Sequence, residues 1–100
     1  MAQVLYLPGA LDDIERLAAF LLQSNPSAAA DTKALIESAI EILASHPLIG
    51  RPADLGFREL IISRGRGGYI ALYRYDHPED RVIVAAIRHQ REAGYPEEAI

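Results

Sequence analysis

One apolar run near the end of the chain decides the fold: Val82-Ile83-Val84-Ala85-Ala86-Ile87. Because every side chain in it is apolar, the run predicts a strand that is buried on both faces and lies inside a sheet. It leads directly into Arg88-His89-Gln90-Arg91-Glu92. The strand end is therefore expected to place two arginines and a histidine at one edge of a rigid core. Guanidinium groups bind phosphates and carboxylates, and histidine transfers protons near neutral pH.

Two more strands are expected before this run. The three strands should cover residues 57–63, 69–76 and 81–90. Arg64-Gly65-Arg66-Gly67-Gly68 forms the first turn between them, and Asp76-His77-Pro78-Glu79-Asp80 forms the second. Glycine, proline and aspartate at these places favour tight hairpin turns. The last part of the chain therefore predicts a three-stranded antiparallel meander.

The first half of the chain predicts a short strand and two helices. The strand covers residues 4–7 and ends at Pro8-Gly9. A first helix follows, with apolar residues at helical spacing: Leu11, Ile14, Leu17, Ala18, Leu21 and Leu22. Asn25 should cap the second helix, with Pro26 in its first turn. That helix is expected to end before Pro47 and to bury Thr32, Leu35, Ile36, Ala39, Ile40 and Leu43.

The order of these elements defines the fold class. A strand, an antiparallel helical hairpin and a three-stranded meander follow one another, with a proline- and glycine-rich loop at residues 46–56. Neither a repeat nor a linker divides residues 1–100, so one domain is expected. We therefore predict an α+β domain with both helices packed on one face of a mostly antiparallel sheet.

Composition excludes several classes of protein. The chain of 100 residues has a net charge of −4 and no cysteine, which excludes disulfides and thiolate chemistry and fits a reducing compartment. Its start resembles no signal peptide, and no apolar run approaches the roughly 20 residues needed to cross a bilayer. We therefore expect a cytoplasmic protein without membrane association.

The charges are unevenly distributed along the chain. Residues 1–50 carry two basic and six acidic side chains, whereas residues 57–91 carry seven arginines and four acids. The helices should therefore be acidic and the sheet mildly basic. Lys33 is the only lysine, so the composition does not favour a protein that grips a long polyanion.

The end of the last strand is the first candidate site. Alternation along a strand predicts that His89 and Arg91 leave the sheet on one face, after Ile83, Ala85 and Ile87. The opposite face would carry Val82, Val84, Ala86, Arg88 and Gln90. Two interpretations remain open, namely a solvated strand end or a site for anion binding and general acid–base chemistry.

A row of tyrosines is the second candidate site. Tyr69, Tyr73 and Tyr75 share one face of the middle strand, and Arg74 lies on the other. Such a row could stack nucleic-acid bases, pack under a helix or bind a protein partner. If the helices leave it uncovered, it is an interaction surface.

Two further groups of residues are weaker candidates for a functional site. Arg64 and Arg66 lie in a turn that lacks the Gly-Lys-Ser/Thr ending of a phosphate loop, so they are expected to be exposed turn residues able to contact a polyanion. His46, His77 and His89 are scattered, with no carboxylate at ligand spacing. We therefore expect neither a metal site nor a cofactor.

Together these residues resemble the RelE/ParE superfamily, the toxic half of type II toxin–antitoxin or plasmid-stabilisation modules. The resemblance covers about residues 3–92 and implies the fold predicted above. Besides the strand and the helical hairpin, four segments carry it: His46-Pro47-Leu48-Ile49-Gly50-Arg51-Pro52, Phe57-Arg58-Glu59-Leu60, the strand from Tyr69 to Tyr75, and Ile87-Arg88-His89-Gln90-Arg91-Glu92.

The resemblance implies one of two activities. The Gly-Arg-Pro loop, the His-Gln-Arg-Glu ending and the missing lysines look more like ParE, which implies growth arrest by inhibition of DNA gyrase. The alternative is a ribosome-dependent messenger RNA endonuclease similar to RelE. The resemblance then implies catalytic residues drawn from Arg58, Arg74, His89, Arg91 and Tyr95. A non-toxic relative that only binds an antitoxin is a third reading.

The resemblance also implies a protein partner. Toxins of this kind are neutralised by a cognate antitoxin, so a toxin–antitoxin hetero-oligomer is expected. An arginine-bearing sheet edge suits a charged, amphipathic peptide. The residues expected to bind the target or the antitoxin are Arg64, Arg66, Tyr69, Tyr73, Tyr75, Arg88, His89 and Arg91.

Overall fold

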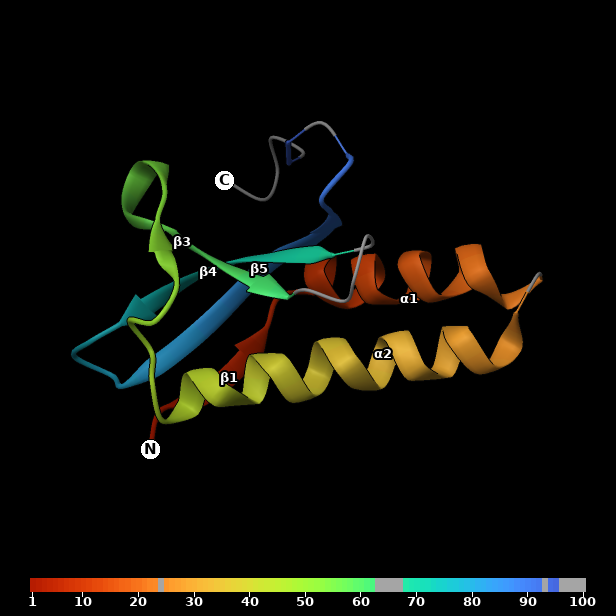
Figure 1. The fold of residues 1–100 in the computed structure, drawn as a ribbon. Coiled ribbons are helices and arrows are strands. Elements are labelled where there is room, and N and C mark those ends of the chain that lie inside the picture. Colours follow the sequence, from red (N-terminus) through yellow and green to blue (C-terminus); the bar gives the residue numbers. More distant parts are fainter. Residues whose placement is uncertain (24, 63–67, 93, 96–100) are drawn as a thin grey trace.

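The computed structural model describes residues 1–23, 25–62, 68–92 and 94–95. Two long helices and five strands make up the fold, with two short 3₁₀ helices between them (Figure 1). In chain order the elements are β1 (Gln3–Tyr6), α1 (Pro8–Leu22), α2 (Pro26–Glu41), η1 (Ile42–Ala44), β2 (Arg51–Pro52), η2 (Asp54–Gly56), β3 (Arg58–Ile62), β4 (Tyr69–Asp76) and β5 (Arg81–His89).

The strands form one sheet in the order β1-β5-β4-β3-β2. Strand β1 pairs with β5 in parallel, and the other neighbours are antiparallel. Figure 1 shows α1 and α2 side by side along the same side of the sheet. The predicted fold class is therefore confirmed. The sequence did not predict β2, a strand of two residues inside the loop expected at 46–56.

Both helices begin at a proline, where the missing N–H is not needed for the helix. Helix α1 starts at Pro8, earlier than the apolar spacing predicts. Asn25 caps α2 as predicted, because its side chain accepts a hydrogen bond from the Ala28 N–H at 3.1 Å. Two residues expected on the buried face of α1, Leu11 and Leu22, are more than half exposed.

Two apolar clusters lie on opposite faces of the sheet. The larger one joins the helices to the sheet through buried residues that include Ile14, Leu17, Ile36, Ile40, Leu43, Tyr73, Val82, Val84 and Ile87. The smaller one lies on the face away from the helices and contains Phe57, Leu72, Ala85 and Ala86. Strand β5 contributes to both clusters, so the prediction of a central strand buried on both faces is confirmed.

A bulge changes which side chains of β5 share a face. Leu72 pairs with Ala86 while the next residue, Tyr73, pairs with Val84, so Ala85 is an extra residue. The alternation reverses there, as expected at a bulge. The prediction that Ala85 and Ile87 lie on the same face is therefore wrong: Ala85 belongs to the smaller cluster and Ile87 to the larger.

The tyrosine row packs beneath the helices. Tyr69, Tyr73 and Tyr75 do lie on one face, with the larger cluster. Tyr73 is 0% exposed and Tyr69 is 8% exposed. Of the three interpretations left open, packing under a helix therefore holds for these two residues, because the helical hairpin covers them. Tyr75 is half-buried at the end of the row, and its hydroxyl donates a hydrogen bond to Asp80 Oδ1 at 2.6 Å.

Gly50 is required where the loop crosses Tyr73. Its N–H donates a hydrogen bond to Tyr73 Oη at 2.9 Å, and a Cβ there would lie 2.6 Å from that oxygen. We expect Gly50→Ala to lower the free energy of unfolding by about 1–3 kcal/mol, because the core must shift. Urea denaturation followed by circular dichroism measures this loss.

Gly9→Ala is the matched control. A Cβ at Gly9 would meet only Ala85 O, at an ordinary contact distance of 3.7 Å. Alanine at this helical position should leave stability unchanged or raise it slightly. Equal losses in the two variants would contradict the close approach at Gly50.

Candidate functional site

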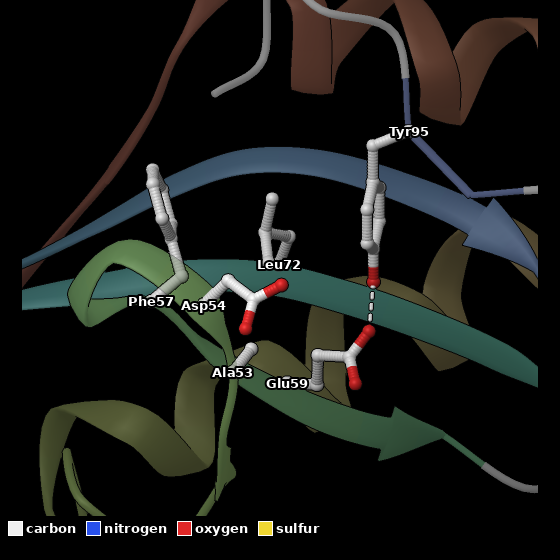
Figure 2. Close-up of a pocket in the computed structure, with 6 residues that line it drawn as sticks. All are labelled: Ala53, Asp54, Phe57, Glu59, Leu72 and Tyr95. Carbon is white, nitrogen blue, oxygen red and sulfur yellow. Dashed lines mark hydrogen bonds between the residues drawn. The ribbon is translucent and has the colours of Figure 1, made fainter.

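The face of the sheet away from the helices holds a cavity of about 280 Å³. Six residues from the β2–β3 region, β4 and the segment after β5 line it: Ala53, Asp54, Phe57, Glu59, Leu72 and Tyr95. In Figure 2 the rings of Phe57 and Tyr95 stand at opposite ends of the cavity, with Leu72 between them. The floor is therefore apolar, and the polar atoms lie along one wall.

Glu59 of β3 forms hydrogen bonds with one residue of β2 and with one residue that follows β5. Its Oε1 accepts a hydrogen bond from Arg51 Nε at 2.9 Å, and its Oε2 accepts one from the Tyr95 hydroxyl at 2.5 Å (Figure 2). Burial alone would raise the pKa of Glu59, but the hydrogen bonds from Tyr95 and Arg51 outweigh it, so the pKa lies below its ordinary value of 4.5. Glu59 is therefore a carboxylate at neutral pH.

Tyr95 is held as a neutral phenol. Burial and the hydrogen bond to Glu59 raise the pKa of Tyr95 to about 12. Its ring also lies beneath the guanidinium group of Arg88, with the Cζ atom 5.0 Å from the ring centroid. These contacts hold the Tyr95 side chain against the open face of the sheet.

Two arginines on this face stack on aromatic rings. The guanidinium carbon of Arg74 lies 5.3 Å from the centroid of Phe57, and Arg88 stacks on Tyr95 in the same way. Arg88 Nη1 donates hydrogen bonds to the carbonyl oxygens of His89, Gln90 and Glu92, and its buried Nε has no hydrogen-bond partner within the described part of the chain. Among the described residues, neither arginine forms an ion pair within 4 Å of a carboxylate.

The strand end places His89 and Arg91 differently from the prediction. Strand β5 ends at His89, and a turn follows in which the Glu92 N–H donates to the His89 carbonyl oxygen at 3.0 Å. The His89 ring packs edge-on against Tyr69 at 5.4 Å, and its Nδ1 accepts the Arg91 N–H at 3.1 Å. His89 therefore helps to hold the turn, and Arg91 is exposed beyond the strand.

Arg58 lies apart from the other candidate arginines. It pairs with Tyr73 across the sheet and shares a face with Leu60 and Ile62, whereas Arg74 projects from the opposite face. Its Nη1 donates hydrogen bonds to the carbonyl oxygens of Leu48 and Gly50. The structure therefore does not gather the predicted catalytic set in one place. Arg64 and Arg66 lie outside the described residues.

Sequence reasoning missed Arg51, Asp54 and Glu59 as parts of a site. The strand prediction does place Phe57 and Glu59 on one face, which was a usable signal for Glu59. Arg51 gives no such signal because it lies in an irregular loop. Its meeting with Glu59 depends on the unpredicted strand β2.

Two negative findings apply to the described ranges 1–23, 25–62, 68–92 and 94–95. No group of three or more histidine and acidic side chains there is placed to hold a metal ion. No helix in those ranges is long and apolar enough to cross a membrane.

The fold is one found in toxin–antitoxin complexes. The crystal structure of the RelBE2 complex from Mycobacterium tuberculosis contains a similar chain, with a TM-score of 0.59 and 25% identity, over 89% of this chain and 98% of that one. The profile of the ParE toxin of type II toxin–antitoxin systems, parDE, matches residues 4–94. This chain therefore belongs to the ParE toxin family, and the resemblance seen in the sequence is confirmed.

Two curated relatives come from Caulobacter vibrioides. Toxin RelE3 is 42% identical over 85 residues, which is 85% of this chain and 90% of the relative. Toxin RelE1 is 36% identical over 62 residues, covering 62% of this chain and 67% of the relative. The family profile and the relatives thus carry names from both branches of the superfamily.

The low pKa of Glu59 predicts a loss of stability in acid. Because the pKa of Glu59 is lower in the folded protein than in the unfolded chain, its ionised form stabilises the fold. This contribution to the free energy of unfolding is complete above the ordinary pKa of 4.5 and is lost as the pH falls through the pKa of the folded state. We expect the free energy of unfolding to decrease as the pH is lowered below about 4.5. For Glu59→Gln, the free energy of unfolding should decrease less steeply with pH than it does for the wild type. Urea titrations between pH 7 and pH 3 measure both slopes. Identical slopes would contradict the assignment.

Proposed function

We propose that this toxin acts on DNA gyrase, as a ParE-like inhibitor of growth, and that a cognate antitoxin neutralises it. The family match over residues 4–94 supports a toxin of the ParE type. We choose gyrase over messenger RNA as the target because the candidate nuclease residues lie far apart from one another. A gyrase inhibitor needs a binding surface, whereas a nuclease needs its catalytic groups assembled around one phosphate.

Metal-free cleavage of RNA needs a base for the 2′-hydroxyl, a proton donor and positive charge on the phosphate. The Tyr95 hydroxyl is a poor base at neutral pH, because its pKa is about 12 and its proton bonds to Glu59. His89 Nδ1 is occupied by the Arg91 N–H. Arg58 projects from the face opposite to Arg74. These positions favour a toxin that does not cleave RNA itself.

The alternative is a ribosome-dependent messenger RNA endonuclease. The RelE names of the Caulobacter relatives favour it, as does the placing of Arg88 beside Tyr95 on the open face. A third possibility is a relative that binds an antitoxin but has lost toxicity.

Induction in growing cells separates these functions. We expect growth to stop, plasmid DNA to accumulate in a cleaved form with gyrase attached, and co-expressed antitoxin to restore growth. Primer extension on abundant messages should show no new codon-spaced 5′ ends early after induction. Early cuts in messages with intact plasmid DNA would establish the endonuclease instead. Normal growth at high expression would establish the non-toxic relative.

A further inference from the structure

We propose that two side chains of α1, Asp13 and Arg16, are positioning residues for the target-binding surface of this toxin. They hold the segment 87–92 in one conformation, so that exposed Arg91 meets the target in a fixed direction. Neither side chain needs to touch the target itself. This role rests on the proposed toxin function, in which the end of β5 belongs to the target-binding surface.

The outer edge of β5 is only partly covered by another strand. Strand β1 pairs with Arg81–Val84, and the Leu7 N–H donates a hydrogen bond to the Val84 carbonyl oxygen at 2.9 Å. Strand β5 continues to His89, and within the described residues no strand pairs with this remaining edge. Backbone groups on such an edge need other partners, because they would otherwise be open to water or to another chain.

Side chains of α1 supply these partners at Ile87. Asp13 Oδ2 accepts a hydrogen bond from the Ile87 N–H at 2.9 Å, and Arg16 Nη2 donates one to the Ile87 carbonyl oxygen at 3.5 Å. The two side chains lie three residues apart on the same face of the helix, with Arg16 Nη2 at 3.6 Å from Asp13 Oδ1. Helix α1 therefore satisfies both backbone groups of this residue, as a neighbouring strand would.

Arg16 extends this contact to the residue that follows Arg91. Its Nη1 donates to Glu92 Oε1 at 2.7 Å and its Nη2 donates to Glu92 Oε2 at 3.3 Å. This hydrogen bonding is the main reason why the pKa of Glu92 lies below its ordinary value of 4.5. A guanidinium group that holds both carboxylate oxygens fixes direction as well as distance. The turn that carries Arg91 is therefore anchored to α1.

The turn is also held by contacts of its own. The Arg91 N–H donates to His89 Nδ1 at 3.1 Å, and Arg88 Nη1 donates to the Glu92 carbonyl oxygen at 2.8 Å. The Arg91 side chain is exposed between these anchors. Because the turn is already ordered, little conformational freedom is lost when a target binds it. Release of the turn from α1 would therefore weaken target binding without removing any group that touches the target.

The ion pair between Arg16 and Glu92 contributes little to the stability of the whole domain. The Arg16 side chain is 51% exposed and the Glu92 side chain is 37% exposed, and exposed ion pairs are weak. The effect of this pair is therefore local and concerns the order of the turn. That difference separates a positioning role from a general role in folding.

The first measurement is amide hydrogen exchange followed by NMR on the purified full-length protein, which requires no target. In Arg16→Gln, the amides of Arg91 and Glu92 should exchange several-fold faster than in the wild type. The amides of the buried residues of α2 should exchange at the wild-type rate. Circular dichroism melting verifies that each variant is folded.

The second measurement is the amount of protein that halves the growth rate after induction, determined by quantitative immunoblotting. Arg16→Gln and Glu92→Gln should each require about three- to tenfold more protein than the wild type, because the turn must be ordered during binding. The double variant should be no weaker than either single variant, because both changes remove the same contact.

Lys33→Gln is the matched control for both measurements. Lys33 forms an ion pair with Glu15 of α1 at 2.7 Å, and both side chains are exposed. The variant therefore breaks an exposed ion pair of α1 and removes one positive charge, as Arg16→Gln does, but it leaves the end of β5 untouched. It should match the wild type in toxicity and in the exchange of the turn amides.

Three results would overturn the positioning role. The turn amides exchange at the wild-type rate in Arg16→Gln, or Arg16→Gln is as toxic as Lys33→Gln, or the losses of Arg16→Gln and Glu92→Gln add in the double variant. Additive losses would mean that Arg16 contacts the target directly. If Arg16→Gln fails to fold, Glu92→Gln decides from the other side of the same ion pair.

Growth arrest separates a failure of this role from a failure of the proposed target. Growth arrest by the wild type with unimpaired gyrase would overturn the gyrase assignment alone, because the comparison of variants does not depend on the target. A wild type that does not arrest growth would overturn the toxin function and the positioning role together.

Discussion

Tyr73→Ala should cost this domain a large part of its stability. The side chain is fully buried under the helical hairpin, and its hydroxyl accepts the Gly50 N–H at 2.9 Å. Removing a buried aromatic ring costs about 3–5 kcal/mol, out of about 5–15 kcal/mol for a typical domain. Equilibrium urea denaturation should therefore show a large drop in the midpoint, or no folded baseline at all.

Two variants on the same strand face separate the ring from the hydroxyl. Tyr73→Phe keeps the ring but leaves the Gly50 N–H without its acceptor, so it should cost about 1–3 kcal/mol. Tyr75→Ala removes a half-buried ring at the end of the row and should cost less than Tyr73→Ala. A Tyr73→Ala protein as stable as Tyr75→Ala would mean that the helices do not cover the row.

Arg91→Ala should weaken growth arrest strongly while the fold stays intact. Arg91 is exposed beyond the end of β5, and exposed substitutions usually change stability by less than about 0.5 kcal/mol.

Ile87→Ala, four residues earlier, should weaken growth arrest by a different route. That side chain is buried in the larger cluster, and its loss should cost about 2–5 kcal/mol. Growth after induction at matched expression, combined with urea denaturation, distinguishes the two routes.

His89→Ala should lose more stability than Arg91→Ala and less than Ile87→Ala. We expect weaker growth arrest together with a measurable loss of stability, because the ring packs on Tyr69 and holds the Arg91 N–H. Full toxicity of both Arg91→Ala and His89→Ala at equal expression would show that the strand end is not part of the target-binding surface.

The sequence was sufficient to predict the architecture, because the patterns that identify its main helices and strands are local. The apolar run at 82–87 identified the central strand, and Asn25-Pro26 identified the start of α2. The bulge at Ala85 was not predictable, because Ala85 and Ala86 are identical small apolar residues and either could face either cluster. Strand β2 was missed because Pro52 and its neighbours read as a loop, and its pairing with β3 is not local.

The candidate site was harder to predict because its contacts join segments far apart in the chain. Glu59 meets Arg51 through a two-residue strand and meets Tyr95 across 36 residues. Neither contact leaves a periodic signal in the sequence. The tyrosine row shows the opposite case: alternation correctly placed its members on one face, but only the packing of the helices determines that Tyr69 and Tyr73 are buried.

Supercoiling of relaxed plasmid by purified DNA gyrase, with this protein added in increasing amounts, tests the proposed target most directly. We predict that supercoiling falls as the protein is added, that cleaved plasmid accumulates, and that Arg91→Ala has a weaker effect at equal concentration. In a parallel reaction with ribosomes and a defined message, translation should continue without new 5′ ends. Unimpaired supercoiling at excess protein, with the message cut in the ribosome reaction, would contradict the proposal and assign the chain to the messenger RNA endonucleases.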